Sequence, residues 1–227
     1  MNRLLKYFTL LLVFFALTLS AFTQQVKVVC QSTITSGQEV PIILRFVSAD
    51  GEIDTTITGT VYLMANGVTI SKQAVRVIRG VGSVTTRIQA TSSFNLQVGG
   101  YSGSKTIEVE TATSYIGVEG NISSNETWSR EKVYRVTDDI IVDDNVTLTI
   151  QAGTRIFLEK DVNIRVNGKL VTNGSETDPV VFLPFTVGDA WGGVEIEDTN
   201  TPADLNFSIF QGGGGDGDRD FGHSNSQ

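Results

Sequence analysis

NVTLTIQAGTRIFLEKDVNIRVNGKLVTNG, residues 145–174, contains the same pattern twice. Apolar and polar residues alternate in 146–150 and again in 162–166. A turn with a glycine, Gly153 or Gly168, follows each time. Alternation with a period of two predicts half-buried β-strands that end at these turns.

The spacing of the two copies fits two architectures. Val162 repeats the position of Val146, and Gly168 repeats that of Gly153 after nearly the same interval. Asn167-Gly168 is a hairpin signal, which favours an antiparallel meander. The alternative is a parallel β-helix, in which equivalent strands stack and bury their inward side chains against the coils on either side.

A longer motif favours the β-helix. The order of motifs in 126–196 resembles the opening of right-handed parallel β-helix regions in secreted bacterial proteins, from WSREKVYRVTDDIIVDDNVTLTI onward. The resemblance implies that the two copies are successive rungs of one stack, and we expect Trp128 to cover its first coil. The residues that fit are Trp128, Tyr134, Leu148, Ile150, Gly153, Gly168, Leu170, Gly174, Pro179, Val181, Phe182, Trp191, Gly192 and Gly193.

The N-terminal segment 1–23 reads as an export signal. Arg3 and Lys6 precede the apolar run 9–22, and cleavage is expected after Thr23 or Ala21. A membrane anchor is the alternative, but the run is shorter than the roughly 20 residues that a span needs. We therefore expect a secreted or cell-surface protein that meets the membrane only during export.

Residues 24–115 read as a separate β-sandwich. Turn signals recur about every 8–12 residues, as in immunoglobulin-like domains. Residues 34–67, with ADG and GTVYL motifs, and residues 80–100 resemble bacterial Ig-like surface modules. That resemblance implies a spacer or adhesion module. Residues 116–227 are then the N-terminal cap and first coils of the β-helix, so the expected fold class is all-β.

Charge and cysteine content limit the partners. The net charge is −8, and it becomes −10 when the segment with Arg3 and Lys6 is removed. Such a surface repels nucleic acid. Cys30 is the only cysteine, so no intrachain disulfide can form, and we expect it to be a small buried hydrophobic residue.

Two candidate binding sites are visible in the sequence. Asp216, Asp218 and Asp220 occupy alternate positions in a Gly-rich segment, a spacing that suits Ca²⁺; a solvated loop is the alternative. Trp191 precedes two glycines, and an exposed indole there would stack on a sugar ring. A structural Trp packed at a bend is the alternative.

No catalytic constellation can be assembled from the sequence. His223 is the only histidine and lies in the Gly-rich tail, so we expect no Ser-His-Asp or Cys-His site, and no phosphate-binding glycine motif is present. We expect no cofactor other than the Ca²⁺ candidate. The predicted function is non-catalytic adhesion, or contact with polysaccharide or host and cell-surface glycans. One alternative is the front of a β-helix polysaccharide lyase or glycoside hydrolase, with catalytic coils beyond residue 227. The other is a structural stalk. In each case further coils of the same chain are expected.

Overall fold

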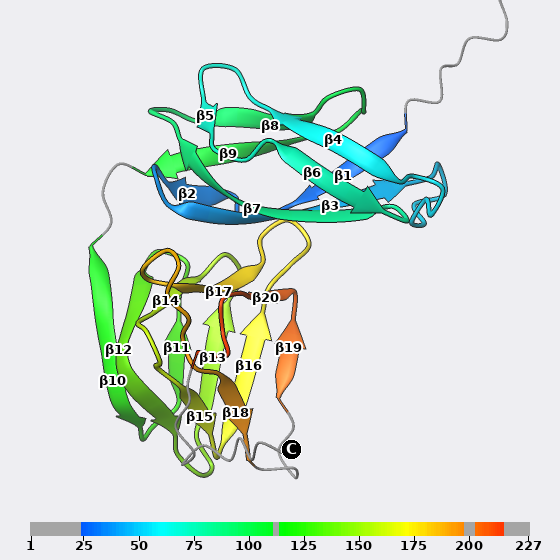
Figure 1. Cartoon of the computed structure of the whole chain (residues 1–227). Helices are drawn as coiled ribbons and strands as arrows, with labels where there is room; N and C mark the ends of the chain where they lie inside the picture. The colour runs from blue at the N-terminus through cyan, green and yellow to red at the C-terminus, as the bar shows by residue number, and fades with distance from the viewer. Residues whose placement is uncertain (1–23, 111–113, 198–202, 216–227) are drawn as a thin grey trace, which may run out of the picture.

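The chain folds into two all-β units, one above the other in Figure 1. The structure is a computed structural model that describes residues 24–110, 114–197 and 203–215. The first unit is a curled sheet of mixed strand direction, and the second is a stack of parallel strands. The predicted all-β fold class is confirmed.

The N-terminal sheet has nine strands in the order β1-β3-β7-β6-β4-β8-β9-β2, with β5 paired to β7. Most pairs are antiparallel, but β2 and β9 run parallel. The two ends of the sheet approach each other, because Gln25 bridges Ser102 between β1 and the β8–β9 turn. The strands are β1 Gln25–Val29, β2 Thr33–Thr35, β3 Glu39–Val47, β4 Gly59–Met64, β5 Thr69–Ile70, β6 Ala74–Ile78, β7 Val81–Gln89, β8 Phe94–Val98 and β9 Ser104–Glu110.

Alternation places one face of each strand inside the curled sheet. Ile42, Leu44 and Phe46 of β3 are fully buried there, as are Leu63 of β4 and Leu96 of β8. Burial of each such side chain stabilises the fold by roughly 1.5–3 kcal/mol. The sheet therefore has its own hydrophobic core, separate from the core of the second unit.

The second unit is a parallel β-helix. Every strand pair in it is parallel, so the hairpin meander that Asn167-Gly168 suggested is excluded among the described strands. The strands are β10 Tyr115–Ile122, β11 Glu126–Trp128, β12 Val133–Val142, β13 Thr147–Gln151, β14 Arg155–Leu158, β15 Ile164–Val166, β16 Lys169–Asn173, β17 Val180–Pro184, β18 Val194–Ile196, β19 Asp204–Asn206 and β20 Ser208–Phe210.

The repeat is longer than the spacing in the sequence suggested. Leu148 of the first copy pairs with Leu170, which lies beyond the second copy, whereas Ile164 of the second copy pairs with Ile140. Segments 146–150 and 162–166 therefore lie on different sides of the stack. The prediction that they are successive rungs was wrong, because one coil must cross three sides before the chain returns to the same ladder.

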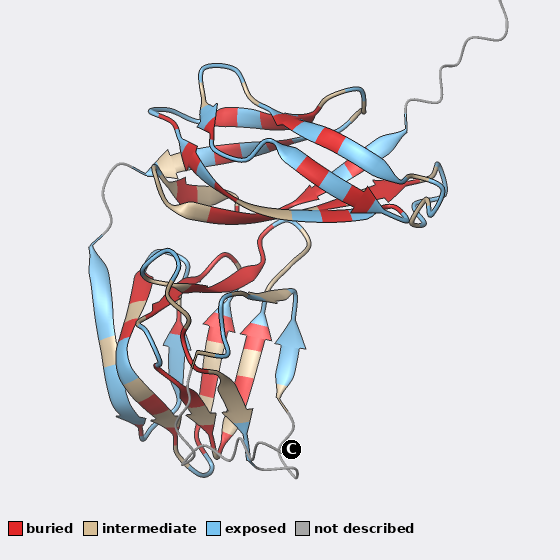
Figure 2. Ribbon diagram, in the orientation of Figure 1, coloured by how far each residue is buried: buried red, intermediate tan, exposed pale blue. Residues whose placement is uncertain are grey.

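Inward side chains form continuous ladders between coils. Ile150 follows Trp128 in one ladder, and Ile164 lies between Ile140 and Val194 in another. Trp128 is fully buried on the first coil and stacks on Tyr134 at 4.5 Å, as expected of a residue that closes this end. Figure 2 shows the resulting alternation of buried and intermediate positions along β13 and β16.

Two local features of the β-helix stand out. Residues 205–210 form a corner between β19 and β20, with Phe207 in the left-handed region at φ 42°. Strand β10 begins at Tyr115, where the N-terminal sandwich was expected to end. It is exposed along most of its length because it is the outermost strand of its sheet, so its residues carry little apolar alternation.

Candidate functional site

The predicted sugar-stacking residue is enclosed. Trp191 is 3% exposed and belongs to the core of the β-helix. Its Nε1 donates a hydrogen bond to the carbonyl of Gln211 at 2.7 Å, and the position where Gly213 would carry a Cβ is 3.2 Å from the indole ring. The indole therefore packs between coils, and its ring has no free face for a sugar.

The predicted calcium ligands cannot be placed. Asp216, Asp218 and Asp220 lie outside the described residues, as does His223. Within the ranges that the structure describes, no three His, Cys, Asp or Glu side chains come together as a metal site would require. The same ranges contain no helix that is both long and apolar enough to cross a membrane.

The most elaborate arrangement of polar groups is the seam between the two units, where the N-terminal sheet covers one side of the β-helix. Strands β2, β3 and β7 face this side in Figure 1. Three outward side chains of β14 and β17 are apolar here: Phe157 is 5%, Val181 0% and Leu183 2% exposed. Both faces of these strands are therefore buried, the inner one in the stack and the outer one under the sheet.

One ion pair between a buried arginine and an exposed glutamate joins the sheet to the outer face of β14. Arg155 is 2% exposed, and its Nη2 lies 2.7 Å from Oε2 of Glu110. Its Nη1 donates to Oγ1 of Thr35 at 3.0 Å. A guanidinium held in this way fixes the angle between the two units, because both partners come from β2 and β9 of the sheet.

A second group of polar contacts surrounds the turn 175–178 between β16 and β17. Asp178 is 7% exposed and accepts a hydrogen bond from the backbone N–H of Ser32 at 2.9 Å. Its other oxygen lies 2.9 Å from Nη1 of Arg130. Lys105, 9% exposed, donates to the carbonyl of Thr177 and to Oγ of Ser32. The turn is thus inserted between side chains of β9 and the β1–β2 connection.

The partner turn at Gly153 is shaped to receive Asp178. Gly153 adopts φ +76°, and a Cβ at this position would lie 2.9 Å from the Asp178 carboxylate. Its N–H donates to the carbonyl of Asp178, while its own carbonyl accepts from Nε2 of the buried Gln31 at 3.2 Å. A glycine is needed here both for the conformation and for the close approach.

Cys30 lies beside this cluster and is inert. Its side chain is fully buried, and desolvation raises the pKa of the thiol to about 12, with Lys105 lowering it and Asp178 raising it. The thiolate is the reactive form, so the native thiol is protected near neutral pH. The expectation that Cys30 is a small buried hydrophobic residue is confirmed.

This burial has a testable consequence. Near neutral pH, the native protein is expected to show no reaction with a chromogenic disulfide reagent, and to react fully after unfolding in urea. The pKa of the unfolded thiol is near 9.0, so stability is unaffected below that pH and falls as the pH rises toward 12. Rapid labelling of the native protein would contradict the burial of Cys30. A Cys30→Ala variant, which has no thiol, gives the background signal of the reagent.

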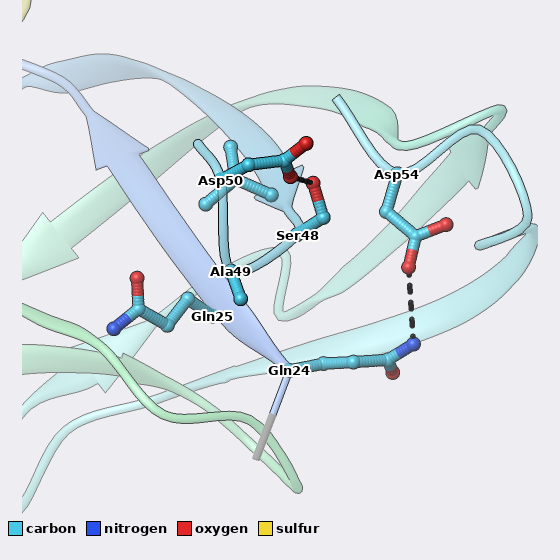
Figure 3. Close-up of a pocket in the computed structure, with 7 residues that line it drawn as sticks. Gln24, Gln25, Ser48, Ala49, Asp50 and Asp54 are labelled. Atoms are coloured by element: carbon cyan, nitrogen blue, oxygen red, sulfur yellow. Dashed lines mark hydrogen bonds between the residues drawn. The ribbon is translucent and has the colours of Figure 1, made fainter. Parts of the chain in front are cut away.

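A hollow lies at the far end of the N-terminal sheet. It has a volume of about 630 Å³ and is lined by residues 24–25, 47–50 and 54. Figure 3 shows its two carboxylates, both held by neighbours. A hydrogen bond from Ser48 lowers the pKa of Asp50, and one from Thr56 lowers that of Asp54, to which Gln24 also donates. These groups stabilise two turns, and nothing further points to a ligand.

Within the described residues, the far end of the β-helix presents apolar side chains that are partly exposed. Ile196, Leu205 and Phe210 occupy inward positions on the three sides of the last coil, yet they are 40%, 43% and 40% exposed. Each follows a fully buried residue in its ladder, and Phe210 stacks on Phe182 at 4.5 Å. The backbone edges of β18, β19 and β20 are the outermost of their sheets.

Comparison with known proteins agrees with this architecture. Residues 120–222 match a family model described as a pectate-lyase like beta helix domain. No curated protein and no solved structure is significantly similar to the chain. The C-terminal unit is therefore a pectate-lyase-like β-helix domain, and an all-β mixed sheet precedes it.

The sequence reasoning missed the seam. Its members, among them Arg155 and Asp178, sit in strands or turns that gave no motif. One signal was present: VVFLPF, residues 180–185, is apolar at consecutive positions. An uninterrupted apolar strand indicates burial on both faces, and here the second face lies under the N-terminal sheet.

Proposed function

We propose that this chain is a non-catalytic part of a secreted or cell-surface bacterial protein that contacts glycans. The observation that carries the proposal is the seam. In the seam, the N-terminal sheet covers one outer side of the β-helix, and Arg155 and Asp178 of the β-helix contact the sheet. A side that is covered in this way supports a fixed platform rather than a substrate cleft. In this proposal the N-terminal sheet is an Ig-like surface module held in one orientation.

Export is part of the proposal and is tested separately. The apolar run 9–22 and the basic residues before it support an N-terminal signal. Expression in a bacterium with its own export machinery should give an extracellular or periplasmic product that begins after Thr23 or Ala21. Mass spectrometry of the intact product measures this, and an uncleaved product retained in the inner membrane would favour an anchor.

Glycan contact is tested with the whole chain on a glycan array and on intact bacterial and epithelial cells. Saturable binding that soluble sugar displaces is the expected result. Complete lack of binding to the array and to both cell types would favour the structural stalk.

One alternative has an observation in its favour. The family description of residues 120–222 names pectate lyase, so the chain is also a candidate for the front of a polysaccharide lyase. A lyase cleaves by β-elimination and leaves an unsaturated, ultraviolet-absorbing product. We expect no such product from polygalacturonate with this chain. Its appearance would overturn the non-catalytic proposal.

The far end of the β-helix supports a further proposal about assembly. Leu205 and Phe210 occupy ladder positions whose outer sides are uncovered. A further coil of similar size stacked there would bury these side chains and pair the three strand edges. The mass of the native exported protein, compared with that of this chain, tests whether such coils belong to the same polypeptide.

A further inference from the structure

The outer face of the N-terminal sheet, on the side away from the β-helix, carries an uncharged groove. Strands β4, β8 and β9 form this face (Figure 1). Two hollows of about 330 Å³ and 270 Å³ lie on it and share Met64 and Gln97, which are paired across β4 and β8. They adjoin at these two residues and follow β8 from its first residues to the β8–β9 turn, and we treat them as one shallow groove.

The lining of this groove differs from the rest of the surface. None of its residues is charged, although the chain has a net charge of −8. Its polar groups are amides and hydroxyls, from Asn66, Ser93, Asn95, Gln97, Tyr101 and Ser104. Glu108, farther along β9, is engaged by Ser93, which donates to its Oε2 at 2.5 Å.

An apolar platform adjoins these polar groups. Tyr62 and Met64 project from the same face of β4 and are 57% and 53% exposed. The neighbour of Tyr62 across the strand pair is Gly99, whose N–H donates to the Tyr62 carbonyl at 3.0 Å. Gly99 has no side chain, and the Met64 thioether lies against it: a Cβ at Gly99 would be 3.0 Å from the Met64 sulfur. A tyrosine ring and a thioether beside free amides suit a ligand with both C–H faces and hydroxyls.

The amide of Gln97 is available to such a ligand. Among the described residues, neither Gln97 nor Asn66 uses its side chain in a hydrogen bond, and the Tyr62 hydroxyl is likewise free. Asn95 is partly engaged, because its Oδ1 accepts from Oγ1 of Thr106 at 2.8 Å. The groove therefore offers several donors and acceptors and no fixed charge.

We infer that this groove binds a segment of an uncharged polysaccharide. The inference rests on the proposal that the chain contacts glycans, and it names the place and the class of glycan. The lack of charge in the groove and the acidic remainder of the chain disfavour an anionic chain such as polygalacturonate. Sugar rings pack their C–H faces on Tyr62 and Met64, and their hydroxyls bond to Gln97 and Asn66.

Affinity gel electrophoresis of the whole chain tests this inference. The gels contain galactomannan, xyloglucan or arabinoxylan as neutral probes, or polygalacturonate as the charged one. We expect retardation by at least one neutral probe and none by polygalacturonate. The variants Tyr62→Ala and Gln97→Ala are expected to bind about tenfold more weakly. Circular dichroism confirms that each variant is folded.

Ile78→Ala is the matched control. Ile78 is 54% exposed on the outer face of β6 and pairs with Val81 of β7, whereas Tyr62 lies two residues from Met64, which lines both hollows. Replacing Ile78 removes a similarly exposed side chain and should leave binding unchanged. Binding by the wild type that Tyr62→Ala and Gln97→Ala leave intact would overturn the groove but not glycan contact. Retardation of the wild type by polygalacturonate alone would also overturn the groove as a site for uncharged polysaccharide, but not glycan contact. A wild type that binds no probe here and no glycan on the array would overturn both.

Discussion

Replacing Ile150 with aspartate is expected to abolish folding of the β-helix. Ile150 is fully buried on β13, directly after Trp128 in its ladder and before Thr172. A carboxylate there would lie between two coils with no cation to pair with it. An unpaired buried charge belongs to the small class of substitutions that cost more than about 4 kcal/mol.

Thr149→Asp is the control, because it adds the same charge at the adjacent position, on the opposite face. Thr149 is half-buried, and its neighbours in the ladder are Thr127 and Val171. Its carboxylate would point to solvent, so a cost below about 1 kcal/mol is expected. The pair separates the effect of facing the core from the effect of charge on β13.

Tryptophan fluorescence measures the outcome. The chain has two tryptophans, Trp128 and Trp191, and both are buried in the β-helix. In Ile150→Asp the emission should shift to that of exposed indole, and the C-terminal part should become sensitive to protease. Ile164→Asp, at an inward position on another side of the stack, should behave in the same way. Blue-shifted emission and protease resistance in these variants would argue against the stack.

Ile150 and Ile164 show which part of the fold could be predicted from the sequence. The inward positions of Ile150 and Ile164 follow from alternation alone, because a strand with a period of two has only one apolar face. The length of the coil did not follow. Gly153 and Gly168 mark turns at two different corners, and only Gly153 has a positive φ, so their spacing measures part of a coil. Only the pairing of Leu148 with Leu170 gives the full repeat.

The seam could not be predicted for a different reason. Its charged members come from distant parts of the chain: Arg155 meets Glu110, and Asp178 meets Ser32. The residues next to each member in the sequence do not indicate which distant residue it will contact. The groove at Tyr62 and Gln97 could not be predicted for the same reason. It exists only because β4 and β8 are neighbours in the sheet, although β5, β6 and β7 all lie between them in the chain.

Replacing Asp178 with alanine is expected to uncouple the two units. The change leaves the N–H of Ser32 without its acceptor and removes the carboxylate from a cluster that contains the buried ammonium of Lys105. A buried group that loses its partner costs more than the bond contributes, so we expect a loss of about 3 kcal/mol.

Glu176→Ala is the matched control from the same turn. Glu176 also pairs with the N-terminal sheet, at 2.8 Å from Arg45 and 3.3 Å from Lys27, but all three side chains are about a third or more exposed. Exposed pairs contribute little, so a loss below about 1 kcal/mol is expected, although the same charge is removed.

Two optical signals from one urea titration distinguish the variants. Circular dichroism reports both units, whereas tryptophan fluorescence reports only the β-helix. In the wild type and in Glu176→Ala the two transitions should coincide, because the seam makes separate unfolding unfavourable. In Asp178→Ala they should separate, with one unit unfolding before the other. If Asp178→Ala and Glu176→Ala are equally stable and both transitions coincide, burial of Asp178 is not what couples the units. The Arg155–Glu110 pair and the apolar face around Phe157 would then supply the coupling.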